Sequence, residues 1–236
     1  MMDRKEKRPG VKRDAKRILI VDDHPVFREG LARVLDREPD FEVVGEASSA
    51  RQGFELVDKI KPDAVLIDLS LPDSSGMELV KNLRATHPTM AMLIISMHDE
   101  TMYAERLLRA GADGYIMKIE GPDRIVQAIR QVLRHQTYVS PRMSDRLLGT
   151  FSGNRKKSES PISRLTDREF EILRLIGSGH DSHSIGRQLN ISPKTVDTHR
   201  SHIKEKLHLH SGMELICYAV RWVQTQPTHS SLAAAE

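Results

Sequence analysis

The sequence predicts an α/β fold, a doubly wound five-stranded parallel sheet, followed by an all-α domain. Between residues 17 and 140, short apolar runs alternate five times with segments whose apolar residues recur at helical spacing. The apolar runs are nearly continuous, which is typical of strands that helices cover on both faces. From residue 162 onward the apolar periodicity is helical throughout.

The positions of the strands and helices follow from the same periodicity. We expect strands at 18–21, 42–47, 64–67, 92–96 and 114–117, and helices at 25–35, 50–60, 76–86, 101–110 and 122–136. Leu79, Val80 and Leu83 illustrate the helical spacing, which places their side chains on one face.

Local signals mark the helices of the C-terminal part. Thr166 and Glu169 have the spacing of a capping box, which predicts a helix start. Ser192 as N-cap, with Pro193 at the first helical position, predicts another helix. We expect a final amphipathic helix over 213–223.

The composition divides the chain into two domains, a linker and two tails. The segment from Ser152 onward is rich in Gly, Ser, Asn and basic residues, which is typical of a flexible linker. The tails are expected to be disordered. The predicted parts are a first domain at 17–138, a linker at 139–161, a second domain at 162–226, and tails at 1–16 and 227–236.

Composition also narrows the class of protein. The first 17 residues have no apolar core, so we expect no secretory signal, and no apolar run approaches the ~20 residues that cross a bilayer. The single cysteine, Cys217, excludes an intrachain disulfide and favours a reducing, cytoplasmic compartment. Because Cys217 lies in an apolar helical pattern, we interpret it as a small core residue.

The net charge of +3 hides an asymmetry. Residues 17–140 carry −5, whereas residues 141–161 carry +3 and residues 162–226 carry +2. An acidic body suits cations and a basic one suits phosphates. The charges therefore favour a cation site in the first domain and an anionic partner for the second.

Polar side chains gather at the carboxyl ends of the predicted strands. Asp22 and Asp23 follow the first strand, Asp68 follows the third, Ser96 ends the fourth, and Lys118 follows the fifth. In an open parallel sheet ligands bind beyond these ends, so we expect the groups to converge. Three carboxylates with one ammonium remain net negative, which favours a hard divalent cation, Mg²⁺.

This set of groups predicts phosphoryl chemistry. Asp22 and Asp23 would hold the metal ion, and a third carboxylate beside a metal and an ammonium can attack phosphorus as a nucleophile. The cation and Lys118 would neutralise charge on the phosphoryl group, to which Ser96 offers a hydroxyl. We interpret His24 and His98, which lie nearby, as loop residues.

The order of these residues resembles the receiver domain of bacterial two-component response regulators, the CheY-like fold. The loop DLSLPDSSGMEL is similar to the family pattern D-x-x-M-P-x-x-x-G-x-E-L, with Leu71 in place of Met. The residue after the lysine is Ile119, where many relatives carry proline. The resemblance implies that Asp68 is the phosphoacceptor and that Ser96 is the switch hydroxyl. It also implies that Tyr115 is the switch aromatic residue and that Lys118 contacts the phosphoryl group. The metal ligands that it implies are Asp22, Asp23 and Asp68.

The second domain resembles the LuxR/NarL/FixJ-type helix-turn-helix over residues 163–224. Apolar residues at matching positions should form its core: Leu165, Ile172, Leu173, Ile176, Ile185, Leu189, Val196, Ile203 and Leu207. With Val196, Ile203 and Leu207 packed inward, the opposite face of that helix would enter the major groove of DNA. The candidate DNA-binding residues are Lys194, Thr195, Asp197, Thr198, Arg200, Ser201 and Lys204. The family also implies a dimer contact through Met213 and Cys217.

The sequence thus favours a phosphorylation-controlled transcription factor and not an enzyme. A partner histidine kinase would phosphorylate Asp68, and the protein would bind double-stranded DNA as a homodimer. Two alternatives stay open: a metal-dependent phosphatase with Asp68 as nucleophile, and a constitutive DNA binder whose receiver only dimerises. A zinc site at His199 and His202 is disfavoured, because no cysteine or carboxylate clusters with them at ligand spacing.

Overall fold

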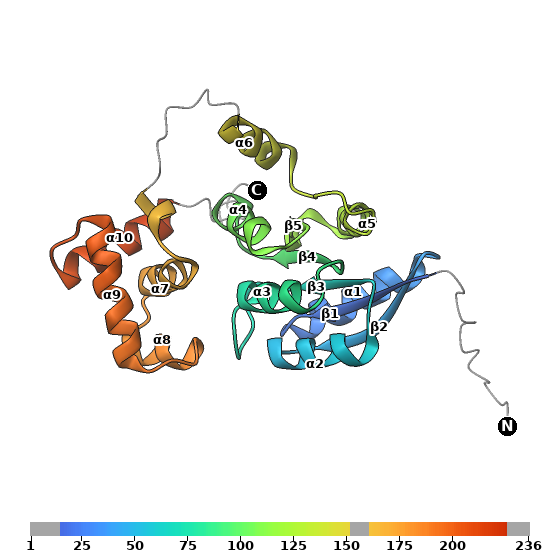
Figure 1. Cartoon of the computed structure of the whole chain (residues 1–236), viewed down its shortest axis with the longest axis horizontal. Coiled ribbons are helices and arrows are strands. Elements are labelled where there is room, and N and C mark those ends of the chain that lie inside the picture. The colour runs from blue at the N-terminus through green and yellow to red at the C-terminus, as the bar shows by residue number, and fades with distance from the viewer. Residues whose placement is uncertain (1–14, 152–160, 226–236) are drawn as a thin grey trace, which may run out of the picture.

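The computed structural model describes residues 15–151 and 161–225, which form an α/β domain and a helical domain (Figure 1). The predicted disorder of the N-terminal tail, of the segment from Ser152 and of residues 227–236 lies outside the described residues, although Lys16 already belongs to the first strand. None of the described helices combines the length and the apolarity that crossing a membrane requires.

Five parallel strands form one sheet in the order β2-β1-β3-β4-β5. The chain starts at an inner strand and winds outward in both directions, so the strand order reverses between β1 and β3. All five predicted strands are confirmed: four agree within one residue at each end, and the first begins two residues earlier than predicted. Their bounds are β1 (Lys16–Val21), β2 (Phe41–Ala47), β3 (Ala64–Ile67), β4 (Ala91–Ser96) and β5 (Gly114–Met117).

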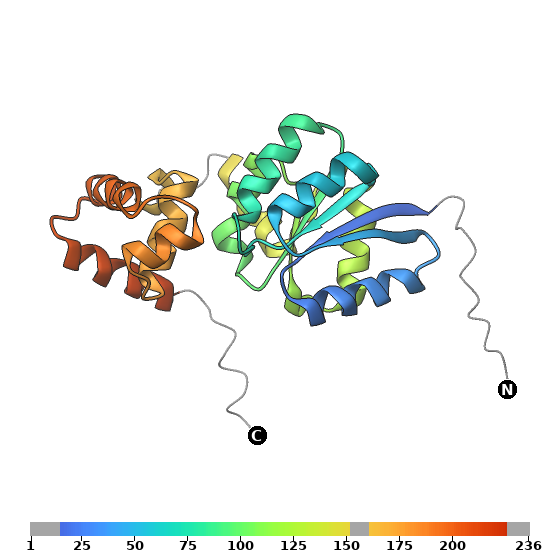
Figure 2. The same ribbon diagram turned by 90° about the horizontal axis from the view of Figure 1, so that it is seen from below.

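Helices cover both faces of the sheet (Figure 2). Successive strand residues point to opposite faces, so Leu19 and Val21 pack in one core with α2, α3 and α4, while Ile18 and Ile20 pack in another with α1 and α5. The helix predicted over 122–136 is wrong at its end, because a turn follows Val132. The helices are α1 (Pro25–Arg37), α2 (Ala50–Ile60), α3 (Gly76–Thr86), α4 (Glu100–Ala110) and α5 (Pro122–Val132).

The predicted linker contains a helix that the sequence analysis did not predict, α6 (Pro141–Phe151). Its start is capped by Ser140, whose hydroxyl oxygen accepts a hydrogen bond from the Met143 amide at 3.2 Å and whose O–H donates to Glu100 on α4. Met143 is fully buried, and α6 packs against α4. These contacts with a distant part of the chain stabilise a helix that the mixed local composition does not indicate.

The helical domain follows a short 3₁₀ turn, η2 (Pro161–Arg164), and consists of α7 (Asp167–Gly177), α8 (Ser182–Gln188), α9 (Pro193–Leu207) and α10 (Gly212–Thr225). The predicted capping box is confirmed, since Glu169 Oε2 accepts from the Thr166 amide at 2.7 Å and Thr166 Oγ1 accepts from the Glu169 amide at 3.3 Å. Eight of the nine predicted core residues are buried, and Leu189 is half-buried.

The prediction that Cys217 is a core residue is wrong, because its side chain is exposed. Helix α10 buries Leu215 and Ala219, which lie one turn apart. Cys217 lies halfway between them along the chain and so projects from the opposite side of the helix.

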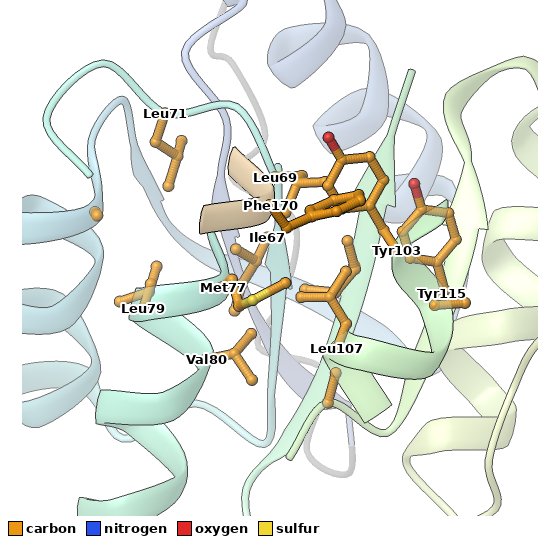
Figure 3. Close-up of a cluster of buried hydrophobic side chains, with 14 of the residues drawn as sticks. Ile67, Leu69, Leu71, Met77, Leu79, Val80, Tyr103, Leu107, Tyr115 and Phe170 are labelled. Carbon is orange, nitrogen blue, oxygen red and sulfur yellow. The ribbon is translucent and has the colours of Figure 1, made fainter. Parts of the chain in front are cut away.

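The two domains share a packed contact between α4 and the start of the helical domain (Figure 3). The rings of Tyr103 and Phe170 meet edge to face at 5.1 Å, and Arg106 lies 4.7 Å above the Phe170 ring. Arg106 also donates to the carbonyl oxygens of Leu165 at 2.9 Å and Ile162 at 2.8 Å. The domain contact therefore combines an aromatic pair with hydrogen bonds from Arg106 to the segment that begins the helical domain.

Candidate functional site

The carboxyl ends of β1, β3 and β5 bring the predicted acidic and basic side chains together. The Asp68 amide donates to the Val21 carbonyl oxygen at 2.8 Å, so Asp68 lies beside Asp22. The Lys118 ammonium lies 2.7 Å from Asp22 Oδ2 and 2.8 Å from Asp68 Oδ2. All three side chains are at most 4% exposed, so this is a buried ion cluster and not a polar surface loop.

Burial determines the electrostatics of Asp68. Desolvation raises the pKa of Asp68, and the hydrogen bond and charge of Lys118 offset this only in part, while the Asp22 charge adds to the increase. Phe27 supports the lysine from α1, since its ring centroid lies 4.5 Å from Lys118 Nζ. One buried ammonium thus serves two carboxylates, which leaves the cluster short of positive charge.

Asp23 and His24 complete the group at the mouth of the site. His24 Nδ1 lies 2.7 Å from Asp23 Oδ1, 3.3 Å from Asp22 Oδ1 and 3.6 Å from Asp68 Oδ2. One ligand atom from each of these four residues lies within 4.8 Å of every other. The interpretation of His24 as a plain loop residue is therefore incomplete, and its position directly after two aspartates was the available signal.

The donor set fits Mg²⁺. Three carboxylates from two strand ends offer oxygen ligands, which this hard cation prefers. Asp23 Oδ1 is buried and makes no hydrogen bond within the described part of the chain, apart from its ion pair with His24. Asp22, Asp23 and Asp68 could hold the ion together, with the His24 ring turned away.

Ser96 and Tyr115 are buried and meet at the backbone of His98. Ser96 Oγ accepts a hydrogen bond from the His98 amide at 3.1 Å, and the Tyr115 phenol donates to the His98 carbonyl oxygen at 2.8 Å. Burial raises the pKa of Tyr115, so the phenol stays protonated. The two predicted switch residues thus hold one peptide segment in place, and neither is bonded to an aspartate of the cluster.

His98 connects the acidic cluster with the domain contact. Its Nε2 lies 3.1 Å from Ser70 Oγ, two residues after Asp68, and its ring stacks at 5.2 Å on Tyr103. Burial lowers the pKa of His98 to about 4, and the charges of Arg174 and Lys118 act in the same direction. The interpretation of His98 as an ordinary loop residue is thus incomplete as well.

A cavity of about 230 Å³ lies between the two domains beside this segment. Asp23, Ser70 and His98 line it from the α/β domain, and Arg174 and Gln188 line it from the helical domain. The edge of the acidic cluster therefore faces the helical domain across a space large enough for several water molecules.

The candidate DNA-binding residues lie along α9. Ser192 caps the helix by accepting from the Thr195 amide at 3.0 Å, and Val196 packs inward as predicted. Helix α9 packs against η2, α7, α8 and α10, all of them in the helical domain. Of the seven candidates, Lys194, Thr195, Asp197, Thr198 and Ser201 are exposed, and Arg200 and Lys204 are half-buried.

Two of these residues also have a positioning role. Asp197 Oδ1 accepts a hydrogen bond from Ser182 Oγ at 2.7 Å, and Arg200 donates to the same hydroxyl at 3.3 Å. Ser182 is the first residue of α8, so this network fixes the angle between α8 and α9. The hydrogen bond to Ser182 directs the Asp197 carboxylate toward α8. Lys194 and Thr198 are exposed on the same helix.

Comparison with known families agrees with both parts of this description. Residues 18–130 match the response regulator receiver domain, and residues 163–219 match the bacterial regulatory proteins of the luxR family. The response regulator GacA of Pseudomonas aeruginosa is 37% identical over 206 residues, which cover 87% of this chain and 95% of that protein. The nitrate/nitrite response regulator NarL of Escherichia coli is 34% identical over 209 residues, covering 89% and 95%.

Solved structures show the same architecture. A LuxR-family two-component response regulator from Aurantimonas sp. SI85-9A1 is 35% identical, with a TM-score of 0.55 over 58% of this chain and 99% of that one. RcsB of Salmonella enterica bound to promoter rprA in the presence of BeF₃⁻ is 24% identical, with a TM-score of 0.64 over 87% and 98%. The second likeness supports the fold of both domains in one chain.

Proposed function

The chain belongs to the NarL/FixJ family of DNA-binding two-component response regulators, with a LuxR-type helix-turn-helix, and on this premise we propose that phosphorylation of Asp68 controls its binding to DNA. A partner histidine kinase would be the donor. We assign residues 17–138 to the receiver, 139–161 to the linker and 162–226 to the DNA-binding domain. The proposal locates the protein in the cytoplasm, together with DNA.

The observation that carries the proposal is the buried pair of Asp68 and Lys118. The ammonium lies 2.8 Å from Asp68 Oδ2, and both side chains are almost completely shielded from water. A carboxylate held in this way is fixed in orientation and poorly solvated, which favours attack on phosphorus. Because Lys118 is shared with Asp22, the same cation remains in place to contact a phosphoryl oxygen.

The transfer itself needs one bond formed and one broken. A carboxylate oxygen of Asp68 forms a bond to the phosphorus of the kinase phosphohistidine, the N–P bond breaks, and its electron pair stays on the imidazole. Asp22, Asp23 and Asp68 would hold Mg²⁺, which supplies charge neutralisation on the phosphoryl oxygens. Lys118 supplies the second positive charge, and Ser96 offers a hydroxyl from the neighbouring strand.

We propose that the backbone at His98 transmits the effect of phosphorylation from the acidic cluster to the domain contact. Its amide bonds to Ser96 and its carbonyl oxygen bonds to Tyr115, so a Ser96 hydroxyl that turns to the phosphoryl group releases one of two backbone bonds. The ring of His98 packs on Tyr103 at the domain contact. The shift between states is limited to the difference in free energy with which the phosphoryl group stabilises them.

Helix α9 is the proposed DNA reader. Lys194, Arg200 and Lys204 provide positive charge for backbone phosphates, and the positive end of the helix dipole at the N-terminus of α9 adds to it. Thr195, Thr198 and Ser201 offer hydroxyls to base edges, while Asp197 can accept from cytosine N4. Of the first four residues of α9, only Val196 is buried. The N-terminal end of the helix is therefore accessible to the major groove of DNA.

We propose that the phosphorylated protein binds DNA as a homodimer through α10. Met213 is 69% exposed and Ile216 is 39% exposed, and the exposed Cys217 lies beside them. These residues form an apolar strip on the outer side of the helix, opposite Leu215 and Ala219. A two-fold pair of such strips would bury each other and double the DNA contacts.

Labelling with a small phosphodonor tests the phosphoacceptor. In the presence of Mg²⁺, the wild-type chain should incorporate one phosphoryl group per molecule, and Asp68→Asn should incorporate none. Asp73→Asn is a matched control, since Asp73 lies in the same loop but bonds the amides of Ala50 and Arg51. Equal labelling of wild type and Asp68→Asn would contradict the assignment, and turnover of a phosphate ester would instead favour the phosphatase alternative.

A further inference from the structure

A second group of metal-ligating side chains lies in the DNA-binding domain and shares no residue with the acidic cluster. His199 and His202 are three residues apart on α9, and the structure brings Glu169 of α7 next to them. One ligand atom from each of the three lies within 4.8 Å of the others. The missing carboxylate that disfavoured a zinc site in the sequence is thus supplied from 30 positions earlier in the chain.

Glu169 already acts as a cation ligand. Its two carboxylate oxygens lie 3.0 and 2.7 Å from Lys206 Nζ, and Oε2 also accepts from the Thr166 amide at 2.7 Å. The carboxylate is only 3% exposed, whereas the lysine side chain is 36% exposed. Lys206 can therefore withdraw into solvent when a stronger cation arrives, while Glu169 stays in place.

The two imidazoles are arranged to receive a metal ion. Within the part of the chain that the structure describes, His199 Nδ1 is buried and has no hydrogen-bond partner. The ring of His202 is perpendicular to that of His199, with their centroids 6.4 Å apart, and it lies on the exposed side. A buried ring nitrogen without a partner loses hydration without compensation, and a metal bond would supply that compensation.

We propose that Glu169, His199 and His202 form a Zn²⁺ site. Two imidazole nitrogens and one carboxylate oxygen are a ligand set that zinc accepts, with water at the fourth position. Magnesium prefers oxygen ligands, so the two imidazoles make this site poor for magnesium and suitable for zinc. The proposal does not depend on phosphorylation of Asp68.

Bound zinc would tie the N-terminus of α7 to the middle of α9. Because the ion binds the folded domain and replaces a weaker ionic contact, it should raise the midpoint of thermal unfolding. Lys206 would be released to solvent near the C-terminal end of α9, which adds a mobile positive charge to the DNA-binding helix.

Competition for Zn²⁺ against a chromophoric chelator tests the site in the full-length chain. His202→Gln removes one exposed ligand and should weaken zinc binding about tenfold or more. His210→Ala is the matched control, because that histidine is exposed and lies outside the cluster. Lys206→Gln removes the competing ammonium and should tighten binding. All samples contain millimolar Mg²⁺ and are repeated with Asp23→Asn and His24→Gln, because the receiver group of Asp22, Asp23, His24 and Asp68 also offers ligands to zinc.

The thermal midpoint provides a second readout. Zinc should raise the midpoint of the wild type and of His210→Ala by similar amounts and raise that of His202→Gln by less. The proposal is overturned if the wild type does not compete with the chelator, or if His202→Gln binds zinc as tightly as the wild type.

Discussion

Tyr103 of the receiver and Phe170 of the DNA-binding domain pack edge to face, with ring centroids 5.1 Å apart. Tyr103 also stacks on His98 at 5.2 Å, and Phe170 on Trp222 at 5.4 Å. A continuous row of rings therefore leads from the loop beside Ser96 into the core of the helical domain. Any displacement of His98 changes the surface on which the DNA-binding domain rests.

Arg106 should be the main polar support of this contact. Arg106→Ala removes its bonds to the carbonyl oxygens of Leu165 and Ile162 and to Asp167 at 3.1 Å, so the two domains should separate more often. We expect a larger radius of gyration by small-angle X-ray scattering. Arg109→Ala is the control, because its side chain is 75% exposed and, among the residues that the structure describes, forms an ion pair only with Glu105 on the same helix. Identical scattering of both variants would contradict this role.

Asp23 should lower the free energy of unfolding when no metal ion is bound and raise it when Mg²⁺ is bound. Its carboxylate adds a third negative charge to a cluster with one ammonium, so Asp23→Asn should raise the free energy of unfolding in EDTA by about 1 kcal/mol. In the wild type, Mg²⁺ at ten times its dissociation constant should add about 1.4 kcal/mol. Urea denaturation with and without Mg²⁺ measures both effects. A similar Mg²⁺ increment in Asp23→Asn would show that the ion binds elsewhere.

His98 should make stability depend on pH in a defined window. Burial lowers its pKa from 6.5 to about 4, so the unfolded chain binds a proton before the folded chain does. The contribution of His98 is present above pH 6.5, is lost as the pH falls toward 4, and changes no further below that. In urea denaturation, the free-energy difference between wild type and His98→Gln should shrink across this window. A difference that stays constant would contradict the burial of a neutral imidazole.

Lys194 should contribute to DNA affinity through phosphate contact alone. Lys194→Ala should weaken binding similarly for all sequences and reduce the slope of log affinity against log salt by about 0.9. Fluorescence anisotropy over a range of salt concentrations measures the slope. Arg187→Ala, on the exposed part of α8, is the comparison. A change in sequence preference without a change in slope would assign Lys194 to base contact.

The acidic cluster could be predicted from the sequence because the carboxyl ends of neighbouring parallel strands lie at the same edge of the sheet. Asp22, Asp68 and Lys118 each follow an apolar run, and strand pairing then dictates that they meet. What sequence reasoning missed depends on packing between distant elements. Helix α6 forms against α4, and Glu169 reaches His199 only because α7 crosses α9. No local pattern in either segment encodes those contacts.

The prediction that Cys217 is a core residue is wrong for a different reason. An apolar run on a helix does not specify which side faces the core when both sides carry apolar residues. Leu215 and Ala219 occupy the buried side, and Met213 and Cys217 are left on the exposed side. The same ambiguity makes that side the candidate dimer surface.

The most direct measurement is DNA affinity with and without a phosphodonor, made on the wild type and on Asp68→Asn in Mg²⁺. Target sites would first be selected from random double-stranded DNA. We expect the donor to tighten DNA binding by the wild type and to leave the affinity of Asp68→Asn unchanged. Wild-type affinity that does not respond to a donor that demonstrably labels Asp68 would contradict control by phosphorylation and would favour a constitutive DNA binder.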